Sequence, residues 1–174
     1  MKLAARLISL YFIIFILPSS VLGGNCTVEE LREMGMVEGD GFDRELLFKS
    51  SHGMGKIGRK HGLKTKPRLE SVLEDLEKLF GQHGLGDISK NCLKCLAQSI
   101  VCVVSKCRAA CLKGPCTDGC QRCIEANCKK ALLECIGTSD IPNPCKWESD
   151  YLKYKLPDTD EDESEKKGEA SGTS

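Results

Sequence analysis

The chain has 174 residues, enough for one ordinary domain with tails, and 12 of them are cysteines. This cysteine content is far above normal usage and favours a disulfide scaffold over a reduced, cytosolic domain. The 25 basic and 25 acidic residues cancel in number. They are segregated, however, because residues 49–68 carry only basic charge and residues 158–169 are mainly acidic.

The first 23 residues predict a signal peptide. Lys2 and Arg6 precede an apolar run at residues 7–17, and the small residues Gly23 and Gly24 follow it. A membrane anchor would need about 20 apolar residues, and this run is shorter. We expect cleavage after Gly23. The mature protein should be secreted, either extracellular or in the lumen of a secretory organelle, without a transmembrane anchor and with every cysteine retained.

Residues 24–66 predict a short helix followed by a flexible basic segment. Thr27 and Glu30 have the spacing of a capping box, which would open a helix that ends near Met34. Residues 35–66 then contain seven glycines, and their apolar residues keep no regular period. We therefore expect a mobile segment here, and a pro-region is one interpretation of it.

The basic segment is a candidate site for an anionic partner, because lysine and arginine attract polyanions through counterion release. Secretion favours an anionic glycan over nucleic acid, and a solvated linker is the alternative. The candidate anion-binding residues are Lys56, Arg59, Lys60, Lys64, Lys66 and Arg68.

Two processing signals lie in the same part of the chain. Asn25, Cys26 and Thr27 form an N-glycosylation sequon, which makes Asn25 a candidate glycan acceptor. Arg59 and Lys60 form a dibasic pair at which a precursor could be cleaved.

Residues 67–156 predict a cysteine-rich helical domain that begins with an amphipathic helix. Pro67 suits the first position of this helix. Apolar residues then recur every three or four positions and form one stripe that must be buried, consisting of Leu69, Val72, Leu73, Leu76, Leu79 and Phe80.

The centre of this domain predicts an antiparallel helical hairpin. Residues 91–137 contain ten cysteines and no aromatic residue, so cystines must supply much of the core. Helix-favouring stretches stand on both sides of Gly114 and Pro115, and Gly137 is a helix stop. The fold class is therefore all-α, a disulfide-stapled hairpin with one additional amphipathic helix.

The cysteine spacing on the two arms suggests which residues pair. Cysteines equidistant from the turn should meet across the hairpin, and those four apart share a helix face. The innermost predicted bridges are Cys111–Cys116 and Cys107–Cys120, followed by Cys102–Cys128 and Cys95–Cys135. Four cysteines remain to tie the N-terminal helix and the C-terminal segment to the hairpin: Cys26, Cys92, Cys123 and Cys145.

Two other uses of cysteine compete with this framework. Cys92/Cys95 and Cys120/Cys123 form a CxxC…CxxC array whose spacing suits zinc. A thioredoxin-like redox role would need a βαβ pattern around a CxxC pair, and that pattern is absent from the sequence. The predicted signal peptide and the even cysteine count favour disulfides, with no metal or other cofactor.

The C-terminal part predicts an extended strap and then an acidic disordered tail at residues 157–174. Trp147, Tyr151 and Tyr154 should lie over a helix surface. No catalytic constellation is present in the sequence: the three histidines lie in glycine-rich surroundings and are interpreted as surface residues, namely His52, His61 and His83.

The segments CLKCLAQSIVC, SKCRAACL and CQRCIEANCKKALLECIG resemble, in cysteine rhythm, the helical domains of secreted apicomplexan proteins of the microneme and surface type. This resemblance implies adhesion or an antigen-like interaction and carries over no functional residue. The hairpin is also similar to the α-hairpinin framework of small defence peptides.

We expect a non-enzymatic binding protein that presents exposed side chains on a rigid hairpin to an extracellular protein or an anionic glycan. These side chains are Lys94, Lys106, Arg108, Lys113, Gln121, Arg122 and Lys129. The alternatives are a precursor of a cysteine-rich toxin or defence peptide released near Arg59 and Lys60, and a metal-binding or redox protein that uses the CxxC pairs.

Overall fold

The computed structural model describes residues 23–62, 67–85 and 87–156, and within them it contains helices and connecting turns but no strand. The all-α fold class is therefore confirmed. The predicted signal peptide up to residue 22 and the predicted tail lie outside the described residues. The elements are α2 (Val28–Glu33), α3 (Arg44–Gly62), α4 (Leu69–Gln82), α5 (Lys90–Lys106), α6 (Arg108–Cys111), α7 (Asp118–Ile124), the π-helix η1 (Glu125–Lys129), α8 (Lys130–Ile136), the 3₁₀ helix η2 (Pro144–Trp147) and α9 (Glu148–Lys153).

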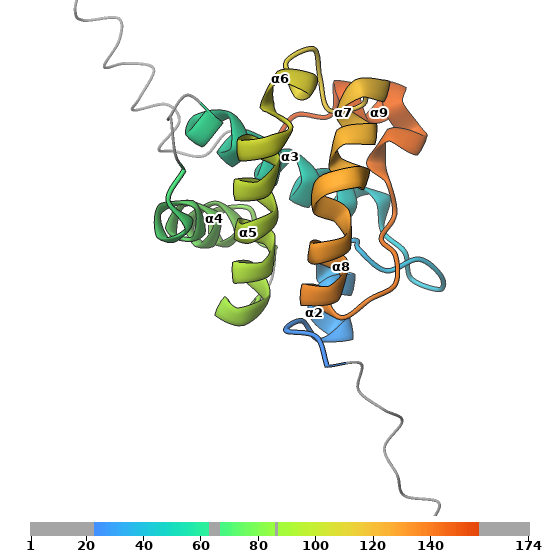
Figure 1. The fold of residues 1–174 in the computed structure, drawn as a ribbon. Helices are drawn as coiled ribbons and strands as arrows, with labels where there is room; N and C mark the ends of the chain where they lie inside the picture. Colours follow the sequence, from blue (N-terminus) through green and yellow to red (C-terminus); the bar gives the residue numbers. More distant parts are fainter. Residues whose placement is uncertain (1–22, 63–66, 86, 157–174) are drawn as a thin grey trace, which may run out of the picture.

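Helix α5 is the central element of the molecule (Figure 1). The arm formed by α7, η1 and α8 runs beside it, and α3 and α4 pack against it and against each other. The core between them is built from buried residues of α3, α4, α5 and α8 and of the end of α2 with the turn after it, among them Met34, Ile57, Leu76 and Leu96. The predicted hairpin is thus one half of a larger helical core.

Helix α2 begins with the predicted capping box. The Thr27 hydroxyl accepts from the Glu30 backbone N–H at 3.2 Å, and the Glu30 carboxylate accepts from the Thr27 backbone N–H at 2.6 Å. The helix ends at Glu33, and Gly35 follows with φ +67°. A Cβ atom at Gly35 would lie 2.3 Å from the Leu47 nitrogen, so only glycine permits this approach to α3.

The prediction of a mobile segment at residues 35–66 was wrong for residues 44–62, which form α3. One side of this helix is buried and carries Leu47, Ser50, Gly53, Ile57 and His61. The spacing is helical, but three of the five are not apolar, so hydrophobic periodicity does not reveal it. Small side chains at these positions let the neighbouring helix approach, and a Cβ at Gly53 would lie 3.0 Å from Leu79 Cδ2.

Helix α4 confirms the predicted amphipathic stripe. Val72, Leu76, Leu79 and Phe80 are buried, and the helix starts at Leu69 with Arg68 as its N-cap, so Pro67 precedes the helix instead of opening it.

The two arms of the hairpin are confirmed but interrupted. The first arm breaks at Cys107, between α5 and α6, and the second contains the π-turn η1. The connecting turn includes Gly114 with φ +130°, and Gly137 ends α8 with φ +83°.

The C-terminal segment is not the extended strap predicted from the sequence, because it forms η2 and α9. Its aromatic side chains do lie over a helix, as predicted: the Tyr151 ring is 5.4 Å from Phe48 and 4.4 Å from His52 on α3. Trp147 stacks on Phe42 at 5.6 Å. The C-terminal segment is therefore more compact than an extended strap, and its aromatic side chains pack it against α3.

In the described part of the chain, each helix is too short or too polar to cross a lipid bilayer.

Candidate functional site

The hairpin contains a ladder of four disulfides that is the best defined candidate site. The outer two bridges, Cys95–Cys135 and Cys102–Cys128, confirm the prediction, and their Cα atoms are 5.7 and 5.9 Å apart. The inner two were predicted wrongly. In place of Cys107–Cys120 and Cys111–Cys116 the structure has Cys107–Cys123 and Cys111–Cys120.

The correction follows from the place where the second arm begins. Helix α7 starts only at Asp118, so Cys116 belongs to the turn and cannot form the first bridge between helices. Cys120, in the first turn of α7, takes that position. Three bridges are then centred in sequence on Pro115, and the fourth lies within half a residue of that centre. A requirement that all four pairs share one centre in the sequence would have predicted these bridges correctly.

Two further disulfides connect the ladder to the ends of the chain. Cys26–Cys92 ties the residue before the N-cap of α2 to the first turn of α5, and Cys116–Cys145 ties the hairpin turn to η2. Cys26 and Cys145 therefore anchor the two ends, as predicted, whereas Cys123 is part of the ladder. All twelve cysteines are paired.

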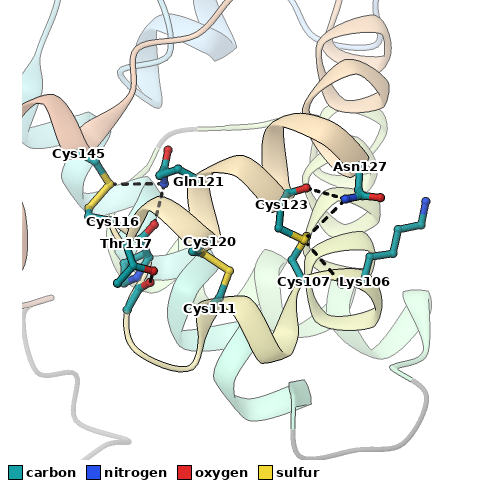
Figure 2. The surroundings of a disulfide bond; sticks show 12 residues. Lys106, Cys107, Cys111, Cys116, Thr117, Cys120, Gln121, Cys123, Asn127 and Cys145 are labelled. Atoms are coloured by element: carbon teal, nitrogen blue, oxygen red, sulfur yellow. Dashed lines mark hydrogen bonds between the residues drawn. A yellow bond between two sulfur atoms is a disulfide. The ribbon is translucent and has the colours of Figure 1, made fainter.

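Polar contacts reinforce the bridge between the turn and η2, as Figure 2 shows. The Gln121 amide donates to the Pro115 carbonyl at 2.6 Å and accepts from the Asn143 amide at 2.8 Å. The Asn143 side chain in turn accepts from the Cys145 backbone N–H at 2.9 Å. Gln121 was predicted to be presented to a partner, but it is engaged in holding the turn.

The end of the hairpin, residues 106–122, is called the tip below. Leu112 is 78% exposed there, the largest value among the three large apolar side chains that are exposed in the described part of the chain. Four of the predicted surface cations also belong to the tip and are exposed: Lys106, Arg108, Lys113 and Arg122. The tip contains one acid, Asp118.

Farther along the second arm of the hairpin, one of the predicted surface cations is already engaged in ion pairs. Lys129, which was also predicted to face a partner, lies 3.2 Å from a Glu125 oxygen and 3.1 Å from an Asp140 oxygen. Hydrogen bonds to these carboxylates raise the pKa of Lys129, the bond to Asp140 contributing most. The three residues help to line a shallow cleft of about 460 Å³, whose charged side chains are three acids and two lysines.

The candidate anion-binding residues are not brought together as a single patch. Lys56 and Arg59 lie on α3, where Arg59 is exposed. Lys60 is paired with Asp75 at 2.9 Å, and Arg68 caps α4. Lys64 and Lys66 lie outside the described residues.

The prediction that the histidines are surface residues was wrong. His61 is 1% exposed, and its Nε2 lies 2.7 Å from an Asp75 oxygen. His83 is also buried, and half-buried His52 contacts the Tyr151 carbonyl at 2.7 Å. Burial, and then the positive charge of Arg59, hold the pKa of His52 below its ordinary value. The unexpected helix α3 is the physical reason, since it carries His52 and His61 toward the core.

The CxxC array does not supply a thiolate site. Its four sulfurs belong to four different disulfides, with Cys26, Cys135, Cys111 and Cys107 as partners. Zinc binding needs deprotonated thiols, and disulfide sulfurs do not provide them. Elsewhere in the described residues, no three histidine, cysteine or acidic side chains are grouped so that they could hold a metal ion.

Asn25 is exposed but packed along the end of α8. Its backbone N–H donates to the Cys135 carbonyl at 2.8 Å, and its side-chain amide donates to the same oxygen at 3.2 Å. The same amide nitrogen also donates to the Cys135 sulfur at 3.6 Å, so a glycan on Asn25 would replace one of the two amide hydrogens at this contact.

The dibasic pair Arg59 and Lys60 lies within helical residues of α3, a conformation that a protease would have to unwind. Cys26–Cys92 would also keep the two products of such a cleavage joined. Both observations weigh against release of a separate cysteine-rich peptide at this pair.

Comparison with known proteins gives no relative: no family model, no curated protein and no solved structure matches the chain.

Proposed function

We propose that this chain is a secreted, non-enzymatic binding protein that presents a rigid helical surface to an anionic extracellular partner, either a glycan or an acidic protein. The observation that carries this proposal is the pairing of all twelve cysteines into six disulfides. Such a framework persists in an oxidising compartment and not in the reducing cytosol.

The same framework favours binding over chemistry. Cysteines are the residues of this chain best suited to redox or metal chemistry, and here all of them are bonded in disulfides. A surface held by covalent cross-links loses little conformational entropy when a partner covers it, which makes a small contact area more effective. The resemblance to secreted apicomplexan proteins would place such a contact at a host interface.

Substitution of Arg59 tests whether the partner is anionic. This side chain is exposed near the end of α3, and after Glu45 that helix carries lysines as well but no acid. Arg32 on α2 is an exposed arginine in a different part of the molecule and gives a matched control.

The experiment is to express the full chain in a secreting eukaryotic cell, map the disulfides and measure elution from a heparin column. We expect six disulfides in protein from the medium, retention on heparin, and elution of Arg59→Gln at lower salt than Arg32→Gln. Retention in the cell or free thiols in the product would contradict the secreted framework. Flow-through of the wild-type protein would contradict a glycan partner.

A further inference from the structure

The tip combines an exposed apolar side chain with four exposed cations, and the proposed function does not use it. Leu112 is 78% exposed, although leucine loses free energy in water in proportion to its exposed apolar area. Val28 and Leu152 are exposed by 54% and 55%, but both belong to helices and not to a projecting turn. The turn after α6 projects from one end of the molecule (Figure 1).

The covalent framework prevents Leu112 from folding back onto the protein. Its neighbour Cys111 is bonded to Cys120, and four residues later Cys116 is bonded to Cys145. Within the turn, the Gly114 backbone N–H donates to the Cys111 carbonyl at 3.1 Å. Leu112 is therefore held outward, and covering it costs little additional ordering.

The charge around Leu112 is uncompensated. No ion pair among the described residues engages Lys106, Arg108, Lys113 or Arg122, and Asp118 is the one acid in the tip. The cations lie on both arms of the hairpin and on the turn that carries Leu112.

We propose that the tip binds the surface of an anionic phospholipid bilayer, with Leu112 inserted at the boundary of the acyl chains and the surrounding cations at the level of the headgroup phosphates. A projecting apolar side chain with several cations on the same turn and neighbouring helices is complementary to a flat anionic surface with an apolar layer beneath it. A sulfated glycan would use the cations and leave Leu112 in water. A protein partner would need a concave acidic pocket, whereas the bilayer needs no matching shape.

This binding is peripheral and reversible. It relies on one inserted side chain and a few surface charges, so it depends on the fraction of anionic lipid and weakens as salt rises. It rests on the six-disulfide framework of the proposed function but not on Arg59 or on heparin binding, so the two proposals can fail separately.

The test is co-sedimentation of the full disulfide-bonded chain with vesicles of phosphatidylcholine alone or with about one third phosphatidylserine, a content that gives a strongly negative surface. We expect binding only to the anionic vesicles. Leu112→Ser should lower the partition coefficient about tenfold, because the transfer of a leucine side chain is lost. Arg108→Gln should lower it about fivefold, the effect of one surface charge.

Two matched controls lie away from the tip. Val28→Ser removes another exposed apolar side chain, and Arg32→Gln removes an exposed arginine. Both residues lie on α2, at the opposite end of the molecule from the tip (Figure 1). Neither should change the partition coefficient by more than about twofold. Unchanged circular dichroism establishes that each variant is folded.

A direct readout of insertion comes from Leu112→Trp. The native Trp147 is partly buried against Phe42, and its fluorescence gives the baseline. We expect a blue shift of the added signal on anionic vesicles and none on phosphatidylcholine. The proposal is overturned if the wild-type protein does not bind anionic vesicles. It is also overturned if Leu112→Ser binds as well as Val28→Ser while Arg108→Gln weakens both vesicle and heparin binding, since that result assigns the tip to polyanions in general.

Discussion

Glu30 connects two parts of the chain that are 59 residues apart in sequence. One oxygen of its buried carboxylate accepts from the Thr27 N–H and the other from the Ser89 N–H, each at 2.6 Å. Ser89 is the N-cap of α5, so a single side chain completes the first turn of α2 and fixes the entry to the central helix. Burial acts to raise the pKa of Glu30, but hydrogen bonds with Ser89 and Thr27 outweigh it and lower the pKa.

We predict that Glu30→Gln destabilises the protein by about 1–2 kcal/mol at neutral pH, because the neutral amide oxygen replaces only one of two charge-assisted bonds. A lowered carboxyl pKa in the folded state means that this stability is present above the unfolded pKa and is lost as pH falls through the folded one. Denaturant unfolding at neutral and at strongly acidic pH measures this.

The matched control for Glu30 is Glu29→Gln, an exposed carboxylate one position earlier in α2. The free energy of unfolding should hardly change in that variant, and the gap between the two variants should close at acid pH. An equal effect of both substitutions at neutral pH would refute the role assigned to Glu30.

At the scale of elements, α3 is a helix that the sequence did not predict. Four of its residues are glycines, at positions 53, 55, 58 and 62, and each costs about 1 kcal/mol relative to alanine in a helix. Local propensity therefore opposes the helix. Tertiary packing stabilises it, because Gly53 lets α4 approach and Ile57 reaches the core.

We predict that Gly58→Ala stabilises the protein by about 0.5–1 kcal/mol through helix propensity. The new methyl would meet only Ile100 Cγ2, at 3.9 Å. Gly53→Ala should gain less or lose stability, because its methyl would lie 3.0 Å from Leu79 Cδ2. Thermal unfolding of both variants tests this, and the absence of any gain in Gly58→Ala would mean that α3 is not formed in solution.

Other elements were predictable because their signals are local. The Thr27 and Glu30 capping box, the apolar stripe of α4 and the break at Gly114 each depend on a few neighbouring residues, and each is present. The inner disulfides were not obtained, because their pairing depends on where α7 begins, and Cys116 could not be assigned to the turn from spacing alone. The partner of Cys116 lies in η2, 29 residues away, and no periodic pattern in the sequence predicts that pairing.

For the whole molecule, the disulfides differ in how much they constrain the unfolded chain. Cys26–Cys92 closes a loop of 66 residues that no other bridge shares, whereas Cys111–Cys120 closes nine residues already enclosed by Cys107–Cys123. By loop entropy the first bridge contributes about 4 kcal/mol and the second less than about 3 kcal/mol.

We therefore predict that the double substitution Cys26→Ser/Cys92→Ser costs more stability than Cys111→Ser/Cys120→Ser. Denaturant unfolding of the two double variants, with the remaining five bridges mapped as intact, measures the difference. Equal costs, or the reverse order, would show that native packing and not chain entropy sets the contribution of each bridge.

The arrangement of the six bridges also determines what a protease can separate. Residues 26–92 form one closed covalent ring, and the overlapping bridges from Cys95 to Cys145 form a second closed system. The two are joined only by the peptide bonds between Cys92 and Cys95, which lie inside α5. A single backbone cut anywhere else from Cys26 to Cys145 opens a ring without releasing a fragment. The molecule can therefore be nicked at its surface and still remain one particle that presents the same tip.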